Sequence, residues 1–302
     1  MSGRVEAARR WGLVAPRGGA ANRNSPAPLS ARFARNRLAI AGLSVVVLFL
    51  IFCFVGPLLH STDQTHTDLT QVNLPPSGSH WLGTDAVGHD QLGRLMYGGQ
   101  VSLLVGLTAG VLATVIGTLW GAVAGYAGGW VDAVMMRVVD AGIAIPALFI
   151  LLVVSAITSP GTFGLIVILG LVSWLVPSRL VRAETLTLKN RDYVLTLRAT
   201  GGTHGRAIRR HILPNSVSTI VVAATFQIAD AILLVAYVSY LGLGVQPPKT
   251  DWGGMLSAGL TAAYSGRWWL IVPPGLAIIL VVCAFNAIGD GLRDAFDVKG
   301  RG

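Results

Sequence analysis

The feature that most constrains this chain is an uncharged apolar run of 22 residues at positions 38–59. About 20 apolar residues in a helix cross the hydrocarbon core of a bilayer. Such a run is expected to be helical, because every backbone polar group inside the bilayer needs a hydrogen-bond partner. Similar apolar stretches follow near residues 101–125, 138–157, 163–180, 216–241 and 269–288. The sequence therefore predicts an all-α polytopic membrane protein with six transmembrane helices.

The basic residues predict how these helices are oriented. With six spans and a cytoplasmic N-terminus, twenty of the 23 Lys and Arg residues fall on the cytoplasmic side and three outside. Cytoplasmic loops of membrane proteins carry such an excess. The same distribution accounts for the net charge of +9 without a nucleic-acid partner. We therefore expect both termini to be cytoplasmic, and residues 60–99 and 242–268 to lie outside.

Composition divides the chain into four parts. Residues 1–29 are rich in arginine and have no apolar face to bury, so we expect a disordered cytoplasmic tail. Residues 30–99 hold the first transmembrane helix and a turn-rich outer loop. Residues 100–297 form the core domain, and residues 298–302 a second cytoplasmic tail. Glycines spaced for close helix packing recur in the second apolar stretch, at Gly106, Gly110, Gly117, Gly121 and Gly125.

A basic segment at residues 191–215 separates the fourth and fifth apolar stretches. Gly201 and Gly202 divide it into two short helical pieces. In the second piece Ala207, Ile208 and Ile212 alternate with arginines, which is typical of an amphipathic helix with a basic face. Two interpretations fit this pattern: a surface helix on anionic lipid, or a docking element gripped by a soluble cytoplasmic partner.

The search for catalytic chemistry identifies no enzyme class. The sequence contains no P-loop, zinc-ligand or dinucleotide-binding pattern. All six histidines lie outside the apolar stretches, so a membrane-embedded hydrolase would lack its base. We therefore expect a non-catalytic chain that binds no cofactor and no metal. Four outer-loop side chains could in principle hold a metal but are interpreted as solvated loop residues: His80, Asp85, His89 and Asp90.

Charged residues near or inside apolar stretches need a partner or water, because burying them in hydrocarbon is costly. Arg137 and Asp140 are spaced to form one pair near the membrane interface, and a second group is expected among Asp290, Arg293 and Asp294. Asp230 differs, because it lies near the middle of the fifth stretch without a basic residue one turn away. It either faces a water-filled substrate path or makes a buried contact in the bundle.

Several long motifs give this chain a specific resemblance, which covers residues 30–297. In the basic segment, Gly201 and the Leu213-Pro214 pair match the signature of the cytoplasmic coupling loop of ABC importer permeases. The chain as a whole is similar to the C-type permease subunit of dipeptide and oligopeptide importers. Four stretches carry that similarity: LGTDAVGHDQLGRLMYGGQVSLLVG (82–106), AGYAGGWVDAVMMRVVD (124–140), SYLGLGVQPPKTDWGGML (239–256) and AFNAIGDGLRDAFD (284–297).

The resemblance implies the type I ABC importer permease fold in a bacterial inner membrane, with cytoplasmic coupling helices in a coupling loop at residues 183–214. It also implies alternating access, a second homologous permease subunit, two P-loop ATPase subunits that bind ATP and Mg, an external solute-binding protein and a peptide substrate. The residues it assigns to ATPase coupling are Asp192, Tyr193, Arg198, Ala199, Gly201, Gly202, Arg206, Arg209, Arg210, Leu213 and Pro214.

The chain departs from the family pattern in two places. Leu195-Thr196-Leu197 stands where the family has Glu-Ala-Ala, so the acidic contact of the coupling loop is missing. Val235 stands where the family often has a glutamate, and Asp230 lies five residues earlier. Relatives of this subunit also serve nickel, glutathione and other small solutes, which remain alternative substrates. A proton-coupled secondary transporter that uses Asp230 is the alternative from another class.

Overall fold

The computed structural model describes residues 29–62, 64 and 67–297, without the side chains of Arg198 and Ala263. Of the two predicted tails, residues 1–28 and 298–302 lie outside this part of the chain, and Leu29 begins helix α2 (Leu29–Phe33). The described residues form helices, turns and one isolated bridge between Thr84 and Asp90, and no β-strand. The predicted all-α class is therefore confirmed.

Helices of membrane-spanning length account for most of the chain. Four single helices qualify by length and apolar composition: α3 (Arg37–Phe54), α5 (Gln91–Ala127), α13 (Val217–Tyr240) and α15 (Val272–Asp297). Two bent pairs qualify if each pair counts as one span: α6 (Gly129–Ile143) with α7 (Ala147–Thr158), and α8 (Thr162–Ser173) with α9 (Leu175–Leu188). The predicted six spans agree with this count.

The third and fourth spans, predicted near residues 138–157 and 163–180, are each broken into two helices. α6 and α7 meet at an angle of 75°, and α8 and α9 at 44°. Pro146 accounts for the first break, since proline lacks a backbone N–H and disfavours helical geometry at the residue before it. The second span begins at Gln91 rather than near residue 101, because the Asp90 carboxylate caps it by accepting a hydrogen bond from Gly93 N at 2.8 Å.

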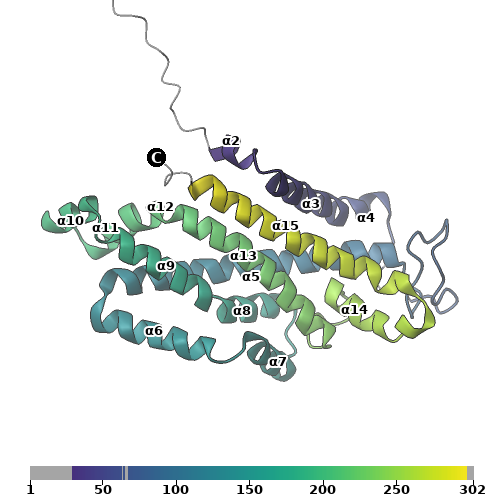
Figure 1. Ribbon diagram of the computed structural model, residues 1–302. Coiled ribbons are helices and arrows are strands. Elements are labelled where there is room, and N and C mark those ends of the chain that lie inside the picture. Colours follow the sequence, from purple (N-terminus) through teal and green to yellow (C-terminus); the bar gives the residue numbers. More distant parts are fainter. Residues whose placement is uncertain (1–28, 63, 65–66, 298–302) are drawn as a thin grey trace, which may run out of the picture.

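α5 is the central helix of the bundle, and it packs most extensively against α9 and α13 (Figure 1). α15 lies alongside α13, and α3 lies along α15. The glycines predicted to allow close packing do so. A Cβ atom on Gly110 would lie 2.8 Å from Ile228 Cα on α13, and one on Gly117 would lie 2.6 Å from the Trp174 carbonyl oxygen at the α8–α9 break. These helices touch through their backbones.

The short helix α14 (Trp252–Leu260) packs against α5, α13 and α15 at the end of the bundle opposite α10 (Figure 1). The Trp252 side chain is fully buried, and its Nε1 donates a hydrogen bond to Leu95 O at 2.9 Å. Asp251 caps α14 by accepting a hydrogen bond from Gly254 N at 2.9 Å. Burial raises the pKa of Asp251 to about 6, because desolvation disfavours the charged carboxylate.

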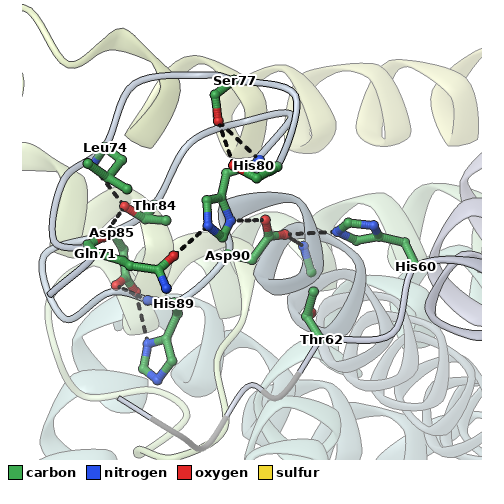
Figure 2. A network of polar contacts seen from close by, with 12 residues as sticks. His60, Thr62, Gln71, Leu74, Ser77, His80, Thr84, Asp85, His89 and Asp90 are labelled. Atoms are coloured by element: carbon green, nitrogen blue, oxygen red, sulfur yellow. Dashed lines mark hydrogen bonds and ion pairs between the residues drawn. The ribbon is translucent and has the colours of Figure 1, made fainter. Parts of the chain in front are cut away.

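The outer loop is ordered by a network of polar side chains around Asp90 (Figure 2). Its carboxylate is within hydrogen-bond distance of His60 Nε2 (3.3 Å) and His80 Nδ1 (3.0 Å). His89 Nδ1 lies 3.1 Å from Asp85 Oδ2. His89 and Asp90 are only 8% and 6% exposed, so the prediction of solvated loop residues was wrong. The histidines and carboxylates partner one another and tie the loop to the start of α5.

Candidate functional site

The coupling loop has the two-piece form that the sequence predicted. α10 (Asp192–Ala199) is followed by α11 (His204–Ala207), the π-helix Ile208–Ile212 and α12 (Leu213–Asn215). Between the pieces Gly201 has φ +80°, a conformation that residues with side chains rarely adopt. Gly202 N then donates a hydrogen bond to Leu197 O at 2.8 Å, which closes the end of α10.

The end of the coupling loop contains a proline inside a continuous helical path. Leu213 N donates a hydrogen bond to Ile208 O, five residues back, and this wider turn forms the π-helix. Pro214 comes next, in the first turn of α12, and α13 follows directly after Ser216. Because Pro214 has no N–H and its ring would clash with a carbonyl one regular turn back, the wider turn accommodates it.

The predicted apolar face of the coupling loop is buried against the rest of the protein. Ala207 and Ile212 are fully buried, and Ile208 packs beside them. They form a hydrophobic cluster with Val194 of α10, and with Tyr126 and Leu188, which lie near the ends of α5 and α9. The apolar face of the coupling loop therefore packs the loop against the bundle, and this face is not free to enter lipid.

The opposite face of the coupling loop is basic and exposed. Arg206, Arg209 and Arg210 border an open hollow of about 410 Å³ together with Thr203 and Gly205. Among the described residues none of these three guanidinium groups has a hydrogen-bond or ion-pair partner. Unpaired guanidinium groups on an ordered surface are suited to bind carboxylates or other anions.

The other residues that the resemblance assigned to coupling lie on the same element. Asp192 is in the first turn of α10 and Ala199 is its last residue. The Tyr193 ring is 5.8 Å from the His211 ring between centroids, so it joins the two pieces of the loop. Arg198 lies on α10 with its side chain outside the described atoms. All the assigned residues therefore belong to α10, α11, the π-helix, α12 and the turn between them.

Two ion pairs connect α9 to α6. Arg182 pairs with Asp132 through two hydrogen bonds of 2.5 and 2.6 Å, and Arg179 reaches Asp140 at 2.5 Å. At the end of α9, Lys189 donates a hydrogen bond to Gly125 O at 2.9 Å. The sequence did not indicate the pair of Arg182 with Asp132, because fifty residues separate them. Only the packing of α6 on α9 brings them together.

The two predicted local pairs were wrong. Asp140 pairs with Arg179 of α9 instead of Arg137 on its own helix. Near the end of α15, Asp294 accepts a hydrogen bond from Asn36 Nδ2 at 3.2 Å. No ion pair forms there among the described residues Asp290, Arg293 and Asp294. Spacing along one helix made local pairs possible, but tertiary partners compete for the same charges.

Asp230 is exposed and lies on an open cavity of about 390 Å³ along one face of α13. Three elements border this cavity: the break between α6 and α7, the break between α8 and α9, and one face of α13. Gln227 of α13 and Ser173, the last residue of α8, border it beside Asp230. The sequence singled out Asp230 alone; Gln227 and Ser173 gave no signal, because neither residue type is unusual in an apolar helix.

Comparison with known proteins agrees with this architecture. A family model described as binding-protein-dependent transport system inner membrane component matches residues 117–301. A second model, the N-terminal TM domain of oligopeptide transport permease C, matches residues 30–76. The two models match most of the chain and leave residues 77–116 between them unmatched.

Curated relatives are similar over most of the chain. The dipeptide transport system permease protein DppC of Bacillus subtilis is 39% identical over 268 residues, which is 89% of this chain and 84% of the relative. A putative peptide permease protein of Brucella suis is 45% identical over 269 residues, 89% of each chain. The oligopeptide transport system permease protein OppC of Escherichia coli is 39% identical over 272 residues, 89% of this chain and 90% of the relative. The chain belongs to the family of binding-protein-dependent transport system inner membrane components, the permease subunits of ABC importers.

Proposed function

We propose that this chain is the membrane-spanning permease subunit of an ATP-driven importer for dipeptides or oligopeptides. Its relatives are named as dipeptide and oligopeptide transport permeases, which supports the substrate class. The complete importer would contain a second homologous permease, two P-loop ATPase subunits that bind ATP and Mg, and an external solute-binding protein. ATP hydrolysis belongs to the ATPase subunits, and this chain supplies half of the path.

One structural observation supports this function above the others: the coupling loop is continuous with the walls of the cavity. α9 runs from the cavity at Leu175 to Leu188, shortly before α10. The pairs of Arg182 with Asp132 and Arg179 with Asp140 hold α6 against α9. α6 ends at Ile143 on the same cavity. A displacement of the coupling loop by an ATPase would therefore reach two of the three cavity walls, as alternating access requires.

The orientation of the chain is our first testable proposal. With both termini in the cytoplasm, a cysteine at Thr70 or Tyr264 should react with an impermeant maleimide in intact cells, since both positions are exposed and belong to the outer segments. A cysteine at Thr200, exposed in the coupling loop, should react only after the membrane is opened. The native Cys53 and Cys283 are replaced by serine beforehand. Labelling of Thr200→Cys in intact cells would contradict the orientation.

The basic face of the coupling loop should hold the ATPase subunits by charge. In mild detergent we expect the wild-type chain to co-purify with P-loop ATPases, and the double variant Arg209→Glu/Arg210→Glu to retain at most about one tenth of them. The wild-type yield should fall with added salt, whereas the residual yield of the variant should depend on salt much less, because its attraction has been removed.

Arg293→Glu is the matched control, because Arg293 is an exposed arginine of α15 and is not part of the coupling loop. It should co-purify ATPases as the wild type does. A wild-type chain that drives peptide uptake without any ATPase would instead identify a proton-coupled transporter. Equal ATPase yields from the wild type and the double variant would contradict ATPase docking on the basic face and favour its binding to anionic lipid.

A further inference from the structure

We propose that the cavity at Asp230 binds the primary ammonium group of the transported solute, with Asp230 as counter-ion and Gln227 as hydrogen-bond acceptor. The inference rests on the proposed function and specifies what the path recognises. The N-terminal ammonium is a group that unblocked peptides share whatever their side chains, so such a subsite would serve a permease that accepts many sequences.

Asp230 is a carboxylate without a partner in a membrane-spanning helix. It lies in the central part of α13, and among the described residues it has no ion pair and no hydrogen bond. None of the residues that line the cavity is basic. Because an intramembrane carboxylate is costly unless it is paired or faces water, the cavity should hold either water or a cation beside it.

Gln227 supplies an independent observation that points to a ligand. Its side chain lies one turn before Asp230 on the same face of α13, borders the cavity and is only 7% exposed. No described residue forms a hydrogen bond with its amide. Its amide therefore has unused hydrogen-bonding capacity where it borders the cavity, and is suited to a polar solute there.

Ser173 adds a third polar group, at the break between α8 and α9. Its Oγ is buried and has no hydrogen-bond partner among the described residues. Ser173 is the last residue of α8 and borders the cavity, but its Oγ is closed off from it, so Asp230 and Gln227 are the groups that can reach a bound solute. The carboxylate of Asp230 and the amide oxygen of Gln227 can together accept three hydrogen bonds, the number that an ammonium group donates.

The composition of the cavity discriminates against other guests. The negative charge of Asp230 disfavours a carboxylate or phosphate. A divalent metal would need more than one ligating carboxylate, histidine or cysteine, and Asp230 is the only such residue among those that line the cavity. Apolar side chains, including Ile143, Ile150 and Leu233, form most of the remaining wall and can accommodate varied substituents. The volume of about 390 Å³ lies within the usual range for small-molecule sites, roughly 300–1,000 Å³.

The charge of the cavity can be tested without knowing the natural solute. Leu234 lines the cavity one turn after Asp230, so Leu234→Cys in a chain with Cys53 and Cys283 changed to serine places a thiol beside the carboxylate. In the purified complex, 2-aminoethyl methanethiosulfonate should label this thiol about tenfold faster when Asp230 is present than in Asp230→Asn. The neutral reagent methyl methanethiosulfonate should label both proteins at equal rates, because it carries no ammonium.

Protection experiments test the ammonium itself. Glycylglycine should slow the labelling of Leu234→Cys by either reagent, and N-acetylglycylglycine at the same concentration should not, because acetylation removes the ammonium and keeps the carboxylate. Gln227→Leu should weaken the protection by glycylglycine severalfold. Equal labelling by the cationic reagent with and without Asp230, or equal protection by both dipeptides, would overturn the proposed subsite.

An uptake assay distinguishes failure of the proposed ammonium subsite from failure of the proposed permease function. In proteoliposomes with the complete importer, Asp230→Asn should lower ATP-driven dipeptide uptake at least tenfold while ATP hydrolysis stimulated by the loaded binding protein persists. Asp290→Asn, on α15 away from the cavity, is the matched control and should transport normally. Normal uptake by Asp230→Asn would refute the subsite and leave the permease function standing. Wild-type uptake driven by a proton gradient without ATP would refute the permease function itself.

Discussion

Replacement of Gly201 by valine is expected to lower ATP-driven uptake at least tenfold while the complex still assembles. Gly201 has φ +80°, and a β-branched residue is strongly disfavoured there. Steric crowding within the chain would not cause the expected loss of uptake, because a Cβ atom on Gly201 would meet no atom within 4 Å. The valine should instead change the backbone angle between α10 and α11. The second piece would then be tilted relative to α10 with its arginines still exposed, so docked ATPases would hydrolyse ATP without driving uptake.

Gly201→Asn separates this conformational argument from a simple clash with a partner. Asparagine also adds a side chain at the same position, but it tolerates a positive φ far better than valine. We expect Gly201→Asn to keep most of the uptake and its coupling to ATP hydrolysis. Measured side by side in proteoliposomes, equal losses in both variants would show that contact with the ATPase, rather than backbone conformation, makes glycine necessary at this position.

A second large effect is expected where α5 meets the break between α8 and α9. A valine at Gly117 would place its Cβ 2.6 Å from Trp174 O and 2.9 Å from Ser178 N, and these backbone atoms cannot move without shifting α9. Overpacking typically costs about 1–3 kcal/mol, and a clash with backbone belongs at the upper end of that range. We expect at least a tenfold lower yield of folded permease in detergent, measured by size-exclusion chromatography.

Val115→Phe provides the control on the same helix. Val115 is 50% exposed, so the added ring would point away from the α5–α9 contact. Its yield should match that of the wild type. A normal yield of Gly117→Val would mean that α9 can move away from α5 at little cost, and would argue against a rigid connection between the coupling loop and the cavity.

The features predicted well from the sequence are those set by local chemistry. Apolar length predicted the spans, and the glycine pair predicted the turn between α10 and α11. The alternation of Ala207, Ile208 and Ile212 with arginines predicted which face of the coupling loop is buried. Each of these signals lies within one helical element, where periodicity and backbone preference act directly.

The features that could not be predicted depend on packing between distant segments. Nothing local distinguishes Asp132 as the partner of Arg182, and the predicted partner of Asp140 lay on the wrong helix. The cavity itself is made by two helix breaks and α13, so Gln227 and Ser173 become recognisable only once these three elements meet. The outer-loop histidines were misjudged for the same reason, since polar composition alone does not reveal a network that removes them from water.

The network around Asp90 also affects how a second protein could associate with the outer surface. His60 and His80 both reach this carboxylate, and His80 Nε2 lies 2.7 Å from Gln71 Oε1, so one cluster holds several turns of the loop (Figure 2). Fixing one residue of a flexible segment costs roughly 1–2 kcal/mol in backbone entropy. Here the described residues of the loop that contact this cluster are ordered before any encounter. A protein that docks on this face therefore loses little of its binding free energy to immobilising the loop, and can dissociate readily without leaving it unfolded.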